Sequence, residues 1–170
     1  YVITVDMKKG TYKTTVEPPW EQVPAKPERF ERVQSTALYS LAVNVRTDDP
    51  YPLDLELTRT KDRLIWSGDG RTVGGAWNEL YCSANTDLGH QWYVYSCNNN
   101  GASWNISQGQ GSGYASYYNY DWGDDSLYTY TSHAITITGY PDGRSSYTWS
   151  CSKWGEDSYL LHCHVWITSS

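Results

Sequence analysis

The stretch Leu80–Cys97, LYCSANTDLGHQWYVYSC, decides the fold because it joins two β-type segments and carries a cysteine near each end. Its polar centre, from Ala84 to Gly89, is rich in turn-forming residues, and the segment from Trp92 to Tyr95 favours a half-buried pleated surface. We therefore expect two short strands joined by a turn. Cys82 and Cys97 could then meet across this hairpin or between neighbouring strands, and closing such a loop stabilises a fold by roughly 3 kcal/mol.

The chain has four cysteines in two local pairs: Cys82, Cys97, Cys151 and Cys163. Four cysteines allow three pairings, and the sequence alone does not choose among them. The even number favours two disulfides and an oxidising compartment. Neither pair has the short spacing of a structural zinc site. We expect a secreted protein, and because the chain begins with Tyr1, one whose leader has already been removed.

The composition excludes some partners and suggests others. The net charge is −6, which argues against nucleic acid or an anionic membrane as partner. No run of eighteen apolar residues predicts a membrane span. The chain has 16 Tyr and 9 Trp but only one Phe, so most aromatic side chains carry a polar tip. Such residues pack β-sheet cores, and they are also enriched at the centres of binding surfaces.

From residue 36 onward the hydrophobic pattern is that of β-strands. Apolar and polar residues alternate over Leu38–Arg46, and a second long alternation covers Ser126–Thr138. Asn98–Gly101 and Pro141–Arg144 are predicted turns, and Gln108–Gly113 is a predicted loop. Ten or so short strands at such spacings predict an all-β fold, an antiparallel β-barrel or sandwich held together by two disulfides.

The first 35 residues differ from the remainder. The segment Tyr1–Val5 alternates like a strand, whereas the charged segment that follows contains four prolines, which remove backbone donors. We expect residues 1–35 to form an N-terminal arm or strand plus a proline-bearing linker. Residues 36–170 are expected to form a single β-barrel domain.

Few residues point to catalysis. No GxSxG motif is present, and both cysteine pairs are better explained as disulfides than as nucleophiles. His162 and His164 share one face of a predicted strand and could begin a metal site, but ordinary surface histidines are the simpler interpretation. The acidic cluster of Asp121, Asp124 and Asp125 lacks the spacing of an EF-hand and is interpreted as a solvated turn. We expect no enzyme, no cofactor and no metal.

Binding residues are predicted among the exposed-type aromatics. The candidates for partner contact are Trp66, Tyr114, Tyr117, Tyr118 and Trp122. Asn105-Ile106-Ser107 is a glycosylation sequon, so Asn105 is a candidate glycosylation site in a secreted chain.

The cysteine framework resembles that of the Alt a 1-like proteins, secreted proteins of filamentous fungi that include allergens and plant cell-death elicitors. The similar segments are Cys82-Ser83-Ala84, His90-Gln91-Trp92-Tyr93 with Cys97, the pair Cys151 and Cys163, and Leu38–Val45. The resemblance implies a β-barrel with disulfides Cys82–Cys97 and Cys151–Cys163. Family members can carry a further N-terminal cysteine that links a dimer; residues 1–81 contain none, so we expect a monomer or a non-covalent dimer.

The resemblance also implies a function without catalysis. We expect a secreted fungal effector or elicitor that induces necrosis or defence by binding a plant host protein. The alternative is a secreted carbohydrate-binding module that uses exposed Trp and Tyr side chains. A small extracellular hydrolase is the third and weakest hypothesis.

Overall fold

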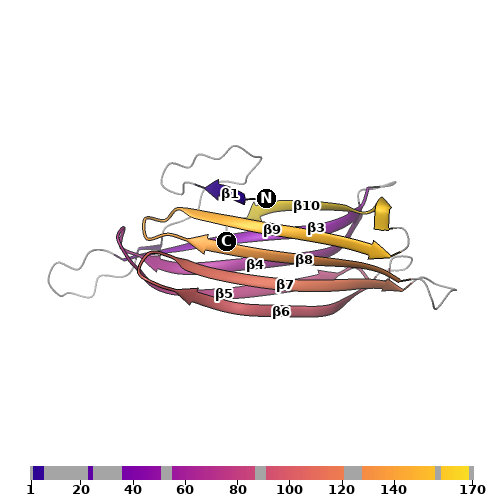
Figure 1. The fold of residues 1–170 in the computed structure, drawn as a ribbon, viewed down its shortest axis with the longest axis horizontal. Helices are drawn as coiled ribbons and strands as arrows, with labels where there is room; N and C mark the ends of the chain where they lie inside the picture. The colour runs from indigo at the N-terminus through magenta and orange to yellow at the C-terminus, as the bar shows by residue number, and fades with distance from the viewer. Residues whose placement is uncertain are drawn as a thin grey trace.

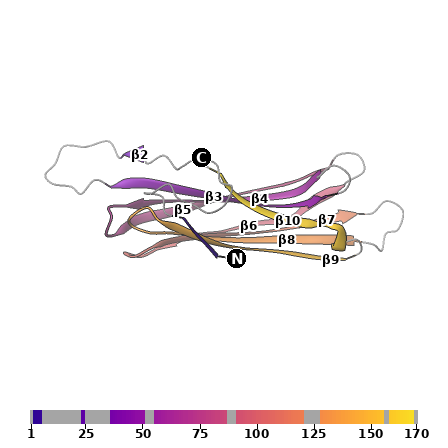
Figure 2. The ribbon, with the colours of Figure 1, turned by 90° about the horizontal axis from the view of Figure 1, so that it is seen from above.

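A computed structural model describes residues 2–5, 23–24, 36–50, 55–86, 91–120, 128–155 and 158–168 of the 170-residue chain. Within these ranges the chain forms ten β-strands and one short 3-10 helix. The strands run along the long axis of the molecule (Figure 1) and lie in two layers (Figure 2). All pairings between them are antiparallel.

Each layer is one five-stranded sheet. The strands of the first sheet are, in spatial order, β1 (Val2–Val5), β9 (Ser145–Gly155), β8 (Tyr128–Gly139), β7 (Gly109–Tyr120) and β6 (Trp92–Trp104). Those of the second are β10 (His162–Thr168), β3 (Ala37–Asp49), β4 (Leu55–Gly68) and β5 (Val73–Ala84), with β2 (Val23–Pro24) paired to β3. The helix η1 (Ser158–Leu160) precedes β10.

The all-β prediction is confirmed, and the architecture is a sandwich rather than a barrel. A barrel requires backbone pairing all the way round. In the described chain, β5 and β6 belong to different sheets, as do β9 and β10, so neither edge is closed by a β-ladder. The barrel that the family resemblance implied is therefore not formed.

Disulfides connect the two sheets where the ladders do not. Cys82 of β5 is bonded to Cys97 of β6, with Cα atoms 6.1 Å apart, and Cys151 of β9 is bonded to Cys163 of β10, with Cα atoms 6.3 Å apart. This is the pairing that the resemblance implied. The hairpin expected at Leu80–Cys97 is wrong, because its two strands lie in different sheets. The disulfide there links sheet to sheet.

Alternation along the strands produces the interior. On β3, Leu41, Val43 and Val45 all point into the space between the sheets and are fully buried. They belong to a larger apolar cluster that also contains buried side chains of β4, β8 and β9. A smaller cluster around Leu57 and Trp92 fills the space near the start of β6.

Two local predictions from turn-type residues are wrong, the turn at Asn98–Gly101 and the loop at Gln108–Gly113. The Asn98–Gly101 segment lies inside β6, where the register shifts between Asn99 and Ala102 and Gly101 adopts a φ of 78°. Glycine and asparagine serve a β-bulge here, which needs the same backbone freedom as a turn. The chain turns instead at Asn105–Gln108, and β7 begins at Gly109. The turn predicted at Pro141–Arg144 is confirmed.

A chain of hydrogen bonds between uncharged groups crosses the interior. Thr47 Oγ1 lies 2.8 Å from His133 Nε2, and Thr60 Oγ1 lies 2.9 Å from His133 Nδ1. Tyr117 Oη lies 2.7 Å from Thr60 Oγ1 and donates to the Arg59 carbonyl oxygen, also at 2.7 Å. Because Tyr117 donates to that carbonyl, Thr60 donates to Tyr117 and accepts from His133. The Nε2 atom of His133 then accepts from Thr47, and burial lowers the pKa of this histidine to about 3.

Asp62 is the buried carboxyl group of the same interior. Asn78 Nδ2 donates to its Oδ1 at 2.6 Å, while its Oδ2 has no hydrogen-bond partner among the described residues. Burial raises the pKa of Asp62 from 3.8 to about 7, and the bond from Asn78 offsets this only in part. Protonated Asp62 therefore favours folding, and this contribution is lost as the pH rises through about 7. Neutral His133 also contributes to the stability of the folded state, and this contribution is lost as the pH falls from 6.5 towards 3.

Asp62→Asn is expected to separate these two effects. The amide cannot ionise, so the variant should be more stable than the parent above pH 7, on the order of 2–4 kcal/mol at one pKa unit per 1.36 kcal/mol. Near pH 4, where Asp62 of the folded parent is already protonated, the difference should be small. Urea unfolding across this pH range measures both values. A variant that is less stable than the parent at pH 8 would contradict the assignment.

Removing either disulfide is expected to loosen one edge of the sandwich. The pairs are separated by 15 and 12 residues, so each double Cys→Ser variant should lose about 3 kcal/mol of stability. Thermal unfolding followed by circular dichroism measures the loss for each pair separately. Unchanged unfolding temperatures in both variants would show that the apolar core alone holds the sheets together.

Candidate functional site

Four aromatic side chains form one row across the outer face of the first sheet, the face turned away from the second sheet. The register aligns Tyr93 of β6 with Tyr118 of β7, Tyr118 with Tyr130 of β8, and Tyr130 with Trp154 of β9. We call these four residues the aromatic row. Neighbouring strands lie about 4.8 Å apart, so the row spans roughly 14 Å. It combines residues that are far apart in the sequence.

The rings of the aromatic row contact one another along its length. Tyr93 stacks on Tyr118 with ring centroids 5.4 Å apart, and Tyr118 and Tyr130 are 6.4 Å apart. Tyr130 and Trp154 are 4.0 Å apart and nearly parallel, at 7°. Two parallel rings at this separation must lie face to face. One face of each ring is therefore turned to the other ring.

Two further tyrosines widen the aromatic row. Tyr128 lies 5.9 Å from Tyr130, and Tyr95 meets Tyr118 edge-on at 6.3 Å. Tyr95 is placed there by a register shift between Val94 and Ser96, which leaves it without a partner on β7. Such a bulge redirects a side chain outward. Tyr95 is 74% exposed as a result.

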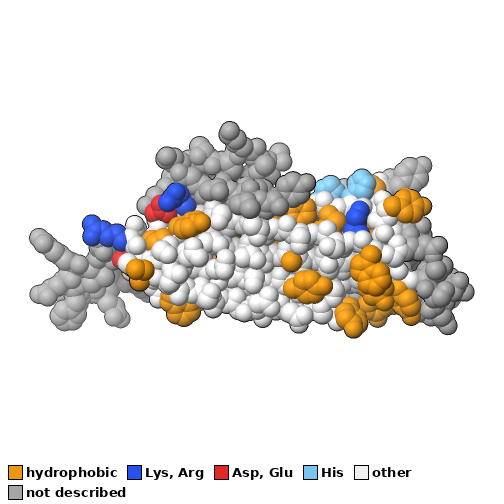
Figure 3. Space-filling view, viewed as in Figure 1, with side chains coloured by type: hydrophobic (Ala, Val, Ile, Leu, Met, Phe, Trp, Pro, Cys, Tyr) orange, Lys and Arg blue, Asp and Glu red, His pale blue; other side chains and the backbone are white. Residues whose placement is uncertain are grey.

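A row of four serines borders the aromatic row. Successive pairs in the register align Ser96, Ser116, Ser132 and Ser152. The hydroxyls of Ser96 and Ser116 lie 2.6 Å apart. Because serine is short, the aromatic row stands above its neighbours as a ridge. Figure 3 shows hydrophobic side chains gathered at this end of the sheet, beside a broad surface of uncharged polar groups.

The contiguous exposed rings make the aromatic row a candidate interaction surface. Exposed aromatic side chains that are contiguous are typical of interaction surfaces on monomeric proteins, whereas scattered ones are ordinary. Trp154 is 60% exposed and Tyr93 is 38% exposed, so the ridge is accessible at both ends. The described residues contain no group of three or more His, Cys, Asp or Glu side chains placed to hold a metal ion.

The structure divides the predicted partner-contact residues. Tyr118 is at the centre of the aromatic row. Tyr114 is exposed on the same face, in the row beyond the serines, and makes no ring contact within the described structure. The prediction that Trp66 and Tyr117 contact a partner is wrong, because both side chains are fully buried. Trp122 lies outside the described residues.

Trp66 and Tyr117 are buried because strand alternation turns them inward. Trp66 stacks on Tyr39 with centroids 5.6 Å apart, and its Nε1 donates to the Tyr140 carbonyl oxygen at 2.9 Å. Its ring covers Gly139, where an added Cβ would lie 2.3 Å from it. Tyr117 holds the interior hydrogen-bond chain, and burial raises the pKa of its hydroxyl. Both residues support the sandwich from within.

The remaining candidates lie apart from the aromatic row. Asn105 is exposed in the turn between β6 and β7, where its Oδ1 accepts a hydrogen bond from the Ser107 amide at 2.8 Å, so the sequon is accessible. His162 and His164 share the outer face of β10, as predicted, and His164 Nε2 lies 3.3 Å from buried Asp48 Oδ2. The acidic cluster of Asp121, Asp124 and Asp125 lies outside the described residues.

Most of the aromatic row was not predicted from the sequence. Tyr118 was among the predicted contact residues, but Tyr93, Tyr130 and Trp154 were not. Strand alternation could have separated Tyr118, which points outward, from Tyr117, which points inward. The alignment of four strands into one row depends on the register, and the bulge at Tyr95 shifts that register by one residue.

No protein-family model, curated protein or solved structure matches the chain. Membership of the Alt a 1-like family therefore stays a prediction from the sequence resemblance. No helix among the described residues is long and apolar enough to cross a membrane. The two disulfides are typical of a protein that folds in an oxidising, extracellular type of environment.

Tyr117→Phe is expected to destabilise the protein by about 1–2 kcal/mol, because it removes a hydroxyl from a buried hydrogen-bond chain. Tyr118→Phe, one residue further along β7, removes an outward hydroxyl and should cost little. Urea unfolding of the two variants gives the comparison. Equal losses would contradict the opposite orientation of the two side chains.

Proposed function

We propose that the protein is a secreted, non-catalytic effector or elicitor that acts by binding a protein of a plant host, and that the aromatic row is its contact surface. The aromatic row is the observation that carries this proposal. It is a raised, accessible line of Tyr and Trp side chains on a sheet that two disulfides link to the second sheet. Tyr and Trp dominate the energetics of protein interfaces because they bury a large area and keep a polar group to bond.

The packing of the rings favours a protein partner over a sugar at this surface. A sugar ring stacks on an aromatic face that is open to solvent. In the aromatic row one face of Tyr130 is turned to one face of Trp154, at 4.0 Å and 7°, so these two faces are closed to a sugar ring. Ring edges and hydroxyls fit a partner that supplies apolar side chains and backbone groups. The uncharged serine row beside them would contact that partner without costly desolvation of charges.

Capture from plant apoplastic fluid tests the proposal. The immobilised protein should retain a discrete host protein, and Tyr95→Ser with Trp154→Ser should weaken its affinity roughly 30-fold or more, as expected for residues that dominate an interface. Infiltration of the same proteins into leaves should give cell death or a defence response with the parent and a much weaker response with the variant.

The matched control changes aromatics that are neither in the aromatic row nor in ring contact with it, whereas Tyr95 meets Tyr118 of the row edge-on. Trp104 and Tyr159 are 55% and 77% exposed, close to Trp154 and Tyr95 at 60% and 74%. Trp104→Ser with Tyr159→Ser should leave capture and the leaf response unchanged. Reduced and alkylated protein should lose both, because the sheets are no longer linked. Equal capture by both double variants would show that the aromatic row is not the contact surface.

A further inference from the structure

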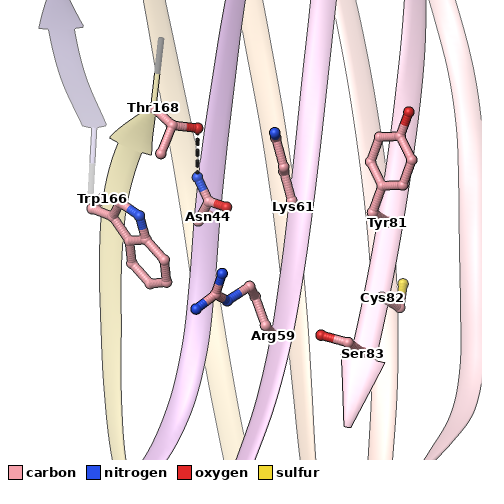
Figure 4. A pocket seen from close by; sticks show the side chains of 8 residues that line it. All are labelled: Asn44, Arg59, Lys61, Tyr81, Cys82, Ser83, Trp166 and Thr168. Atoms are coloured by element: carbon pink, nitrogen blue, oxygen red, sulfur yellow. Dashed lines mark hydrogen bonds between the residues drawn. The ribbon is translucent and has the colours of Figure 1, made fainter. Parts of the chain in front are cut away.

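A hollow of about 340 Å³ lies on the opposite broad surface, across the outer face of the second sheet. One row of side chains across its four strands consists of Trp166, Asn44, Lys61 and Tyr81. Arg59 and Ser83 lie opposite one another in the next row. Figure 4 shows these side chains around the hollow, which we call the outer pocket.

Lys61 gives the outer pocket an uncompensated positive charge. Three arginines of the same face have carboxylate partners: Arg46 with Asp48, Arg59 with Glu56, and Arg63 with Glu79. Lys61, between them, makes no ion pair with any described residue. The whole chain has a net charge of −6, so an unpaired cation in a hollow is a local exception. It fits one negative charge on a ligand.

Arg59 is held in place beside Lys61. Its guanidinium is paired with Glu56 and lies over the Trp166 ring, 5.2 Å from the centroid. Arg46 lies over the same ring at 5.9 Å. A guanidinium that is held by an ion pair and a cation–π contact loses little freedom when it donates to a ligand. Arg59 therefore adds oriented donors without adding a second free charge.

The other side of the outer pocket suits a hydroxylated ring. Tyr81 is 57% exposed beside Lys61, so an aromatic surface is open there. The Ser83 hydroxyl points towards Arg59 (Figure 4). Asn44 Nδ2 donates to Thr168 Oγ1 at 3.1 Å, which leaves the Asn44 carbonyl oxygen on the side of Lys61 (Figure 4). The Ser83 hydroxyl can thus donate a hydrogen bond to a ligand hydroxyl, and the Asn44 side-chain oxygen can accept one. Both groups lie near Lys61 and the Tyr81 ring.

We propose that the outer pocket binds a carboxylated sugar, a hexuronic acid unit of an acidic glycan. The carboxylate lies between Lys61 and Arg59, the sugar ring lies against Tyr81, and ring hydroxyls bond to Ser83 and Asn44. A single carboxylate matches Lys61, which has no ion pair with the described residues, whereas a doubly charged phosphate would leave a charge uncompensated. This site lies on the opposite surface from the aromatic row and does not depend on the proposed function.

Calorimetric titration with trigalacturonic acid and with its neutral methyl ester tests the proposal. The two ligands differ in the carboxylate and share the sugar rings. The parent should bind the acid about tenfold or more tightly than the ester, the size of a hydrogen-bonded charge pair. In Lys61→Gln this preference should largely disappear. Failure of the parent to bind the acid, or an equal preference for the acid in Lys61→Gln, overturns the proposal.

Two further variants complete the test. Tyr81→Ala should lower the affinity for the acid and for the ester by a similar factor, because stacking does not depend on ligand charge. Unchanged affinities would overturn the placement of the sugar ring. Arg71→Gln removes an exposed cation from the turn between β4 and β5, away from the outer pocket, and should leave both affinities unchanged. Because Lys61 and Tyr81 are at least partly exposed, both variants should keep the parent's unfolding temperature, which circular dichroism checks.

Discussion

Two disulfides close the sandwich at its opposite sides, and the rest of the structure depends on this constraint. Cys82–Cys97 links β5 to β6, and Cys151–Cys163 links β9 to β10; in both cases the two strands are consecutive in the chain and lie in different sheets. The sheets are therefore held at a fixed separation even though part of the space between them is polar. The hydrogen-bonded side chains of Thr47, His133, Thr60 and Tyr117 occupy positions that apolar residues would fill in an ordinary core. The carboxyl group of Asp62 occupies another.

Because the sheets are linked at their edges, both broad surfaces are free to carry function. They differ in chemistry. The first sheet presents a ridge of aromatic rings beside serine hydroxyls, whereas the second presents a hollow with cations around Lys61. Successive side chains of a strand point to opposite faces of its sheet. The inward side chains stabilise the core, and the outward ones can therefore change without loss of the core. This geometry gives one small domain two separate outer surfaces, and each of the two proposed binding sites lies on one of them.

Local features of the sequence predicted the elements well. Alternation over Leu38–Arg46 and Ser126–Thr138 identified strands that the structure contains as β3 and β8. The Pro141–Arg144 turn was also correct. The segment Asn98–Gly101 was misjudged because a bulge inside a strand and a turn between strands need the same residues. Among the candidate contacts, Tyr118 lies on the outer face and Trp66 is buried, and composition alone does not separate the two.

The all-β class followed from the sequence, because alternation along each strand is a short-range property. The cysteine pairing came only from the family resemblance, since the residues themselves left three pairings open. Only the tertiary structure decided that Cys82 and Cys97 join two sheets, and that Tyr93, Tyr118, Tyr130 and Trp154 form one surface. The physical reason is register: side chains of neighbouring strands meet according to hydrogen-bond pairing and bulges, and a shift of one residue moves each side chain to the other face.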